Sequence, residues 1–372
     1  MPNAEFLKNA KEAKNDEFYT QYVDIQKEIN SYISYNSDTF KNKTVLLPCD
    51  DPEWSNFTKF FAQNFTRFGL KKLISTSFAV ESKNLETDYQ PTLFESIDPR
   101  FDVNKTRVKG KIFTLTRDEN NDGKVNLDDL KWDYLNGDGD FRSEEVKLLR
   151  DESDIIITNP PFSLFREFVA WIMEAKKQFL VIGNINCITY KEIFPLIKEN
   201  KAWLGSGMGR WISGFLVPKS YGLYGTEARI DEDGNRIVAT NNCLWLTNLE
   251  HAKRHTKVEL STMSENLKFN KTLLKKLEKY GVSTSEYPKY ENYDAIEVPY
   301  SEAIPSDYYG AMGVPITFLD KYNPDEFELL WTTDRGGDGH LDQYKTPHER
   351  YDAPVINGQG LYKRILVKRR QK

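Results

Sequence analysis

Short apolar runs alternate with amphipathic stretches along the first half of the chain. Runs of this kind are typical of buried strands, and they occur at residues 43–49, 70–76, 111–116, 154–158 and 178–183. Between them, apolar residues recur at helical spacing, at Trp54, Phe57, Phe60, Phe61, Phe65 and Phe68 and again at Phe165, Phe168, Val169, Ile172 and Met173. Such alternation builds a parallel sheet covered by helices on both faces. We therefore predict an α/β fold with its chemistry at the carboxyl ends of the strands.

The pattern changes near Ala202. Four further strands are predicted without intervening helices, at residues 202–205, 211–217, 237–239 and 242–247. From about His251 the chain is richer in Tyr, Pro, Asn and charged residues, and its periodicity is weak. Two domains are therefore expected, residues 1–250 and residues 251–372.

The composition is that of a globular protein with a sizeable core. Of the 372 residues, 39% are hydrophobic and 29% are charged. No apolar run is long enough for a membrane span, and the lysine-containing N-terminus lacks the apolar core of a signal peptide. Cys49, Cys187 and Cys243 have no metal-ligand spacing and are interpreted as ordinary thiols in a reducing cytoplasm.

The formal net charge of −5 argues weakly against a nucleic-acid partner, but it is a sum over the whole chain. Phosphate contacts need only one basic face. The C-terminus offers a candidate face in Lys363, Arg364, Lys368, Arg369, Arg370 and Lys372, with a solvated basic tail as the alternative.

The clearest candidate for chemistry is Asn159-Pro160-Pro161-Phe162, which directly follows the apolar run 154–158. Two prolines fix two φ angles at about −65° and remove two N–H donors, so the loop is rigid and presents carbonyl acceptors. The Asn159 side-chain oxygen adds an acceptor, and two acceptors held together can take both hydrogens of an exocyclic amine. Phe162 can stack on the ring that carries the amine. A loop that merely caps the next helix is the alternative, but the strand before it and the helix after it favour function.

This segment after a strand resembles the catalytic motif of amino-methyltransferases that act on DNA. By itself it indicates only a superfamily. The resemblance extends over most of the chain to the EcoRI-type adenine-specific methyltransferase family, in blocks at residues 49–52, 55–57, 137–143, 159–165, 183–184, 191–194 and 313–320. It implies an α/β fold with a Rossmann-like S-adenosylmethionine-dependent methyltransferase domain at 1–250. It also implies a mixed α+β target-recognition region at 251–372.

The resemblance implies transfer of a methyl group from S-adenosylmethionine to the 6-amino group of an adenine flipped out of double-stranded DNA. Asn159 and the Pro160 carbonyl would hold the amine, next to Pro161, and Phe162 would stack on the base. Trp211 and Phe215 are candidates for the opposite face of the base, with core packing as the alternative.

The cofactor residues are also implied by the resemblance. Asp50 and Asp51 occupy the turn after the first strand, where the family binds S-adenosylmethionine; they replace the Gly-rich turn that is commoner among methyltransferases. Asp140 would accept from the amine of the cofactor's adenine, and Phe141 would pack on its face. Thr20 ends an N-terminal segment expected to lie against the cofactor. No acidic residue ends the second strand, so the ribose partner is unassigned.

Three other patterns are weaker. Residues 118–129 fit the spacing of a calcium loop, with a polar connection between strand and helix as the alternative, and the metal is left unassigned. Residues 205–209 resemble a phosphate loop but lie between two predicted strands, which favours a hairpin turn. His251 and His255 are four residues apart without an evident third ligand, so a zinc site is not expected.

The expected partners are double-stranded DNA and, in a restriction–modification pair, a cognate restriction endonuclease. Two other functions share the same sequence features. One is methylation of an amine in RNA or of a protein glutamine, and the other is an inactive DNA-binding module that keeps the fold.

Overall fold

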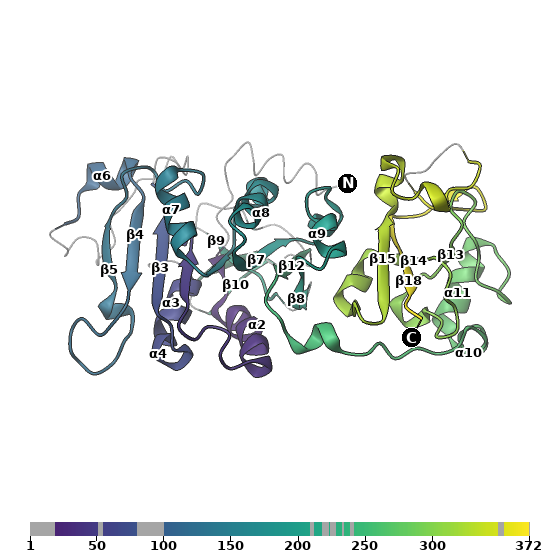
Figure 1. The fold of residues 1–372 in the computed structure, drawn as a ribbon, viewed down its shortest axis with the longest axis horizontal. Helices are drawn as coiled ribbons and strands as arrows, with labels where there is room; N and C mark the ends of the chain where they lie inside the picture. Colours follow the sequence, from purple (N-terminus) through teal and green to yellow (C-terminus); the bar gives the residue numbers. More distant parts are fainter. Residues whose placement is uncertain are drawn as a thin grey trace. The chain divides into compact units, whose positions relative to one another are not determined.

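The computed structural model describes residues 19–50, 55–79, 100–208, 212–217, 223, 228–232, 234–238, 242–348 and 353–371 (Figure 1). The chain forms two compact units: unit 1 is Met1–Ile185 with Leu204–Glu250, and unit 2 is Asn186–Trp203 with His251–Lys372. Packing defines these units, so the functional division into domains 1–250 and 251–372 stays a prediction. Among the described helices, none is both long and apolar enough to cross a bilayer.

An eight-stranded mixed sheet forms the centre of unit 1. Its order is β5 (Lys131–Tyr134), β4 (Lys111–Leu115), β3 (Lys72–Ser77), β2 (Thr44–Leu47), β6 (Ile155–Thr158), β7 (Gln178–Asn184), β12 (Cys243–Thr247) and β8 (Trp203–Met208). The four middle strands β3, β2, β6 and β7 run parallel. β4 is antiparallel to β3 and β5, and β12 is antiparallel to β7. The prediction of a parallel sheet is therefore right for the middle of the sheet and wrong for its edges.

The antiparallel direction of β4 follows from where the chain re-enters the sheet. The helix α6 (Val103–Val108) ends just before β4, and the first residue of β4, Lys111, pairs with the last residue of β3, Ser77. Side chains along β4 alternate between buried and half-buried positions, as in antiparallel strands with one partly solvated face, whereas β6 is buried throughout. The sequence alone does not show this alternation, because Lys111 takes a buried position and Ile112 a half-buried one.

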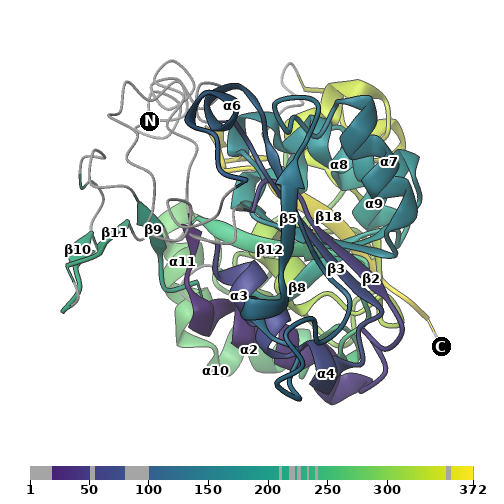
Figure 2. The ribbon, with the colours of Figure 1, turned by 90° about the vertical axis from the view of Figure 1, so that its left-hand side faces the viewer.

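Helices cover both faces of this sheet (Figure 2). α7 (Glu144–Glu152) and α8 (Phe165–Glu174) lie on one face, and α2 (Tyr22–Tyr35), α3 (Asn56–Gln63) and α4 (Phe65–Phe68) lie on the other. The predicted helix over residues 54–68 is two helices, because the Asn64 side chain donates to the Phe60 carbonyl (2.9 Å) where α3 ends. Trp54 lies outside the described residues.

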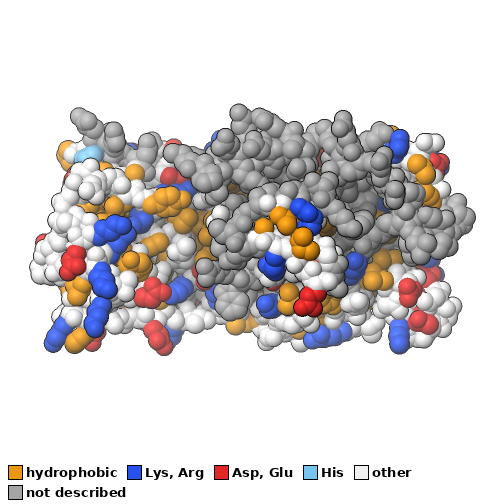
Figure 3. Space-filling view, turned by 180° about the vertical axis from the view of Figure 1, so that it is seen from behind, with side chains coloured by type: hydrophobic (Ala, Val, Ile, Leu, Met, Phe, Trp, Pro, Cys, Tyr) orange, Lys and Arg blue, Asp and Glu red, His pale blue; other side chains and the backbone are white. Residues whose placement is uncertain are grey.

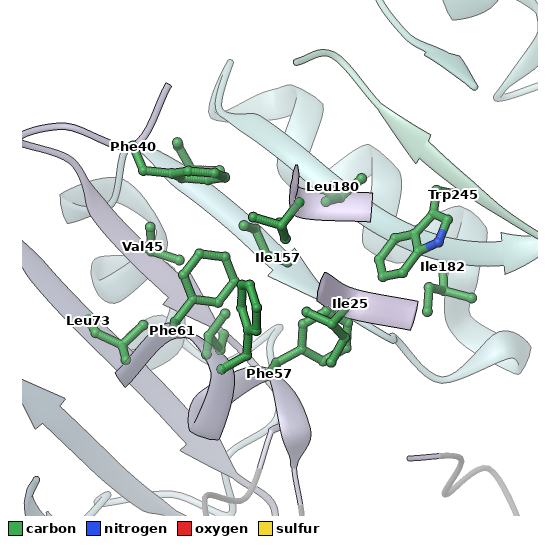
Figure 4. Close-up of a cluster of buried hydrophobic side chains, with 14 of the residues drawn as sticks. Ile25, Phe40, Val45, Phe57, Phe61, Leu73, Ile157, Leu180, Ile182 and Trp245 are labelled. Carbon is green, nitrogen blue, oxygen red and sulfur yellow. The ribbon is translucent and has the colours of Figure 1, made fainter. Parts of the chain in front are cut away.

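A cluster of buried side chains fixes the strands against α2 and α3 (Figure 4). Val45, Ile157 and Leu180 come from three neighbouring parallel strands, and Phe57 and Phe61 come from α3; none is more than 2% exposed. Each fully buried side chain of this type stabilises the fold by about 1.5–3 kcal/mol. The cluster therefore fixes the positions of these strands, whose carboxyl ends carry the candidate site, against α2 and α3.

A second sheet of unit 1 has the order β1 (Tyr19–Thr20), β9 (Phe215–Val217), β11 (Arg236–Val238) and β10 (Arg229–Ile230). The predicted strands 211–217 and 237–239 correspond to β9 and β11. Trp211 and Ala239 lie outside the described residues.

The predicted hairpin turn at residues 205–209 is wrong where the structure describes it, because residues 205–208 belong to β8. The buried Glu28 carboxylate accepts from the N–H groups of Ser206 (2.7 Å) and Gly207 (2.8 Å). A Cβ atom at Gly205 would collide with the same carboxylate and with Trp245. Glycine is required here by close packing rather than by a turn.

Unit 2 is built on a four-stranded mixed sheet. Its order is β13 (Ile296–Glu297), β14 (Met312–Pro315), β18 (Arg364–Arg369) and β15 (Phe327–Thr332), with β18 antiparallel to both neighbours. The ladder of β16 (Val355–Ile356) and β17 (Gln359–Gly360) and the helices α9 (Phe194–Lys198), α10 (Met263–Phe269) and α11 (Lys271–Tyr280) complete the regular structure. Short helical turns in both units are Leu127–Asp129, Phe162–Leu164, Ile185–Thr189, Ala252–His255, Ser301–Ala303, Ile316–Lys321, Thr333–Asp338 and Asp342–Tyr344.

The basic C-terminus is an inner strand of this sheet and not a solvated tail. Arg364 is only 7% exposed and forms an ion pair with the fully buried Glu297, at 2.7 Å. Lys363 Nζ lies 2.8 Å from Thr189 Oγ1, and Arg370 donates to the Pro324 carbonyl (2.8 Å). The prediction of a free basic face is therefore wrong for Arg364. Lys372 lies outside the described residues.

Candidate active site

The carboxyl edge of the parallel strands carries the Asn159 loop. β6 is buried over its whole length and ends at Thr158, and the chain then passes through Asn159, Pro160 and Pro161 into the helical turn that begins at Phe162. The Asn159 side-chain oxygen and Pro160 are buried, whereas Pro161 and Phe162 are half-buried. Prolines suit this position because the loop leaves the ladder, where their missing N–H groups cost no strand pairing.

Asp50 connects this loop to the turn after β2. Its carboxylate is buried and lies 2.6 Å from the hydroxyl of Thr158 and 2.7 Å from the hydroxyl of Ser55. The Thr158 hydroxyl also lies 2.7 Å from the Pro48 carbonyl. Cys49 lies between Pro48 and Asp50 in the chain and has a φ of 66°. This left-handed conformation is uncommon for a residue other than glycine. The turn is therefore held in an unusual shape with a buried carboxylate beside the residue that precedes Asn159.

Contacts along β1 and β9 bring Thr20 to the same place. Thr20 pairs with Phe215, and the Phe215 ring meets the Phe162 ring edge to face at 6.2 Å. Asn56 directly follows Ser55, and its side chain donates to the Thr20 carbonyl (2.8 Å). The structure thus brings Thr20, Asp50 and the 159–162 loop together.

The fully buried Phe215 does not form a parallel slot with Phe162, since their rings are inclined at 81°. Its proposed place on the opposite face of a base stays a prediction. Asp51 and Trp211 lie outside the described residues.

Asp140 and Phe141 follow a loop that packs on the end of β3. Gly139 has a φ of 89°, and a Cβ atom there would collide with the Ser77 carbonyl, so this close approach requires glycine. Phe141 is fully buried, with ring contacts to Phe168 (5.0 Å) and Trp171 (5.6 Å) of α8. The ring therefore anchors the loop to the helix that follows the Asn159 segment. Direct packing of Phe141 on a cofactor stays a prediction.

The Asp140 carboxylate faces Arg142, whose Nε donates to it at 2.9 Å and whose backbone N–H donates at 2.8 Å. Partial burial alone would raise the pKa of Asp140. The hydrogen bonds and charge of Arg142 outweigh that effect, so the pKa lies below its ordinary value. Asp140 is therefore a fixed, ionised acceptor at neutral pH.

Two buried hydroxyls at this edge suit a polar ligand. Thr20 and Thr76 are at most 2% exposed, and no described residue lies within hydrogen-bond distance of either Oγ1 atom. Buried hydroxyls normally have a partner, so unsatisfied ones beside an acidic turn fit a ligand that is polar and cationic at one end.

Three contributors escaped the sequence interpretation. Thr158 and Ser55 bind Asp50, and Arg142 binds Asp140. The sequence shows that Thr158 directly precedes Asn159 and that Arg142 follows Asp140 by two residues. It does not show which carboxylate each side chain binds, because only the fold brings Thr158 to Asp50 and orients Arg142 towards Asp140.

Among the described residues, no group of three or more His, Cys, Asp or Glu side chains could hold a metal ion. In the loop 118–129, Asp129 accepts from the N–H groups of Glu119 (2.8 Å) and Asn126 (2.9 Å). Asp118 accepts from Gly123 (2.8 Å). These carboxylates bind the backbone of their own loop and thereby shape it.

A mixed α/β sheet with an Asn-Pro-Pro-Phe loop at the carboxyl end of a middle parallel strand defines the class of α/β methyltransferases. The chain belongs to the family described as adenine-specific methyltransferase EcoRI, whose model matches residues 6–370. It is 45% identical to the Type II methyltransferase M.EcoRI of Escherichia coli over 98% of this chain and 96% of that protein. It is 34% identical to the Type II methyltransferase M.MpnI of Mycoplasma pneumoniae over 98% of each chain. No solved structure matches the chain.

Proposed function

We propose that this protein transfers the methyl group of S-adenosylmethionine to the 6-amino group of an adenine flipped out of double-stranded DNA. The observation that carries the proposal is the Asn159 loop, a pair of buried acceptors at the carboxyl edge of the sheet. In this proposal residues 1–250 form the Rossmann-like catalytic domain, and residues 251–372 recognise the target sequence. A restriction endonuclease that cuts the same sequence would be its natural partner, as in a Type II pair.

Catalysis rests on the geometry of the target amine. When bound, S-adenosylmethionine supplies a methyl group on a cationic sulfur. The Asn159 side-chain oxygen and the Pro160 carbonyl would accept the two amine hydrogens, which draws the nitrogen lone pair out of the ring and aims it. Phe162 would stack on the adenine ring and fix its plane.

The cofactor would lie between the turn after β2 and the loop on β3. Asp50 supplies a buried negative charge beside the cationic end, next to Asp51, and the Thr20 hydroxyl offers a polar contact. Asp140 would accept from the cofactor's adenine amine, while the buried Phe141 keeps that loop against α8.

Expression in a host without DNA methylation, followed by single-molecule sequencing of its DNA, tests the proposal. We expect 6-methyladenine at one position of one short sequence. Asn159→Ala should lower the single-turnover rate by about two to three orders of magnitude, as for other positioned transition-state contacts. Cofactor affinity, measured by calorimetry, should change much less. Methyl transfer only to RNA or to a protein glutamine would overturn the proposal.

A further inference from the structure

Helix α11 packs one of its faces against the rest of unit 2. Leu273, Leu277 and Tyr280 are buried, and they recur at helical spacing along the helix. The Asn270 side chain accepts from the Leu273 N–H (3.0 Å) at its start, and Gly281 ends it with a φ of 67°. Because both ends and the inner face are fixed, the residues on the opposite face must point away from the unit.

That opposite face carries a lysine stripe, which we define as Lys271, Lys275 and Lys279. All three are exposed, and no described carboxylate lies within ion-pair distance of any of them. Like charges four residues apart on a helix repel each other, so the isolated helix gains nothing from this arrangement. Figure 3 shows Lys and Arg side chains gathered on the surface of unit 2, at the left of the view.

Several other basic residues of unit 2 are already engaged. Lys253 pairs with Asp320 at 2.5 Å, Lys321 with Glu302 at 2.5 Å and Arg364 with Glu297 at 2.7 Å. The contrast marks the lysine stripe as positive charge that no ion pair among the described residues of unit 2 engages.

We propose that the lysine stripe binds the phosphate backbone of the duplex DNA that carries the target base, an inference that rests on the proposed function. Successive lysines are about 6 Å apart along the helix axis, at about 1.5 Å per residue. Successive phosphates of one DNA strand advance by about 3.4 Å along the duplex and also wind around it, so they are about 7 Å apart. The spacing of the stripe therefore matches successive phosphates of one strand. Lysine ammonium groups bind phosphates as point charges, so the contact adds affinity without reading sequence.

The test is the salt dependence of DNA binding by the full chain with Lys271→Gln, Lys275→Gln and Lys279→Gln combined. The slope of log affinity against log salt should become shallower by about 2.7, from about 0.9 for each lost phosphate contact. The affinity for duplex DNA with the target sequence and the affinity for an unrelated duplex should fall by the same factor, since phosphates are common to both.

The matched control removes three exposed lysines of unit 1 that form no ion pair with a described residue and lie near the amino ends of the parallel strands, with Lys71→Gln, Lys124→Gln and Lys176→Gln combined. It changes the net charge equally and should leave the slope nearly unaltered. Glu278→Gln, on α11 itself, should strengthen binding. Thermal unfolding of each variant verifies folding.

An unchanged slope in the folded stripe variant would overturn the inference, and so would a loss confined to the methylated sequence, because that would indicate base contacts. If the wild-type protein fails to methylate DNA, the proposed function fails instead, so the two failures are distinguishable.

Discussion

Thr158 is the residue through which the turn after β2 is joined most directly to Asn159. Its hydroxyl lies within hydrogen-bond distance of both the Asp50 carboxylate (2.6 Å) and the Pro48 carbonyl (2.7 Å). Thr158→Val keeps the shape but removes the hydroxyl, which leaves a buried carboxylate short of a donor. That change should cost about 1–3 kcal/mol of folding free energy. The displaced loop should also lower kcat more than it raises KM for DNA.

Thr158→Ser is the control, since serine retains the hydroxyl. We expect it to restore most of kcat, while chemical denaturation shows a small loss of stability from the missing methyl group. If the valine variant is destabilised but keeps a normal kcat, Thr158 serves only the fold.

Asp140 and Arg142 make a prediction about pH. Because the folded pKa of Asp140 lies below its ordinary value of 3.8, the stability contributed by the pair is present above that value. It is lost as the pH falls through the lower pKa. Asp140→Ala should weaken S-adenosylmethionine binding by about 1.5–3 kcal/mol, the contribution of a hydrogen bond to a charged group.

The Arg142→Gln variant tests the effect of the Arg142 charge separately from the proposed contact between Asp140 and the cofactor. Asp140 stays ionised at neutral pH, so cofactor binding should persist there, but its pKa should rise, because burial is then opposed only by the backbone hydrogen bond from residue 142. Calorimetric titrations from neutral to acidic pH should show affinity lost at a higher pH than in the wild type. Equal cofactor affinity in the Asp140→Ala variant would remove Asp140 from the cofactor site.

At the scale of elements, the sequence predicts best what is local. β6, the Asn-Pro-Pro-Phe loop and α8 are contiguous and strongly patterned, so their order was predictable. The bond between Asp50 and Thr158 was not, because it joins residues 108 positions apart. The residues of β18 (Arg364–Arg369) are interpreted from the sequence as part of a basic face or tail, because Arg364, Lys368 and Arg369 flank its short apolar run. Ile365, Leu366 and Val367, all fully buried, are the signal that identifies it as a strand.

The ion pair in β18 makes a prediction about stability. Glu297 accepts from Arg364, from Tyr280 (2.9 Å) and from Tyr290. Arg364→Ala would leave this buried carboxylate without its cation, which typically costs about 3–5 kcal/mol. We expect a large fall in the thermal midpoint of unfolding. Glu297→Gln combined with Arg364→Met should recover much of it, because no buried charge remains. A loss below about 1 kcal/mol for Arg364→Ala would show that the pair contributes little.

At the scale of the whole molecule, the sign of the net charge is opposite to the one expected for a protein that binds DNA. The chain carries a net charge of −5, yet its proposed substrate is a polyanion. Acidic residues are part of the candidate site itself, where Asp50 and Asp140 would serve a cationic cofactor. Basic residues must therefore be arranged locally for DNA, and overall charge is a poor guide to the partner.

Target access gives the last prediction. The two acceptors of the Asn159 loop are buried at the carboxyl edge of the sheet, and an adenine stacked inside a duplex cannot place its amine between them. The base must leave the stack, which costs a few kcal/mol, and less where its pairing is already weak. A mismatch at the target should therefore tighten binding relative to the paired site. With 2-aminopurine in place of the target adenine, fluorescence should rise on binding, because the base is no longer quenched by its neighbours. The same probe one base pair away is the control and should stay dim. An absent rise at the target, with tight binding and normal methylation of ordinary DNA, would mean that the amine reaches Asn159 without the base leaving the stack.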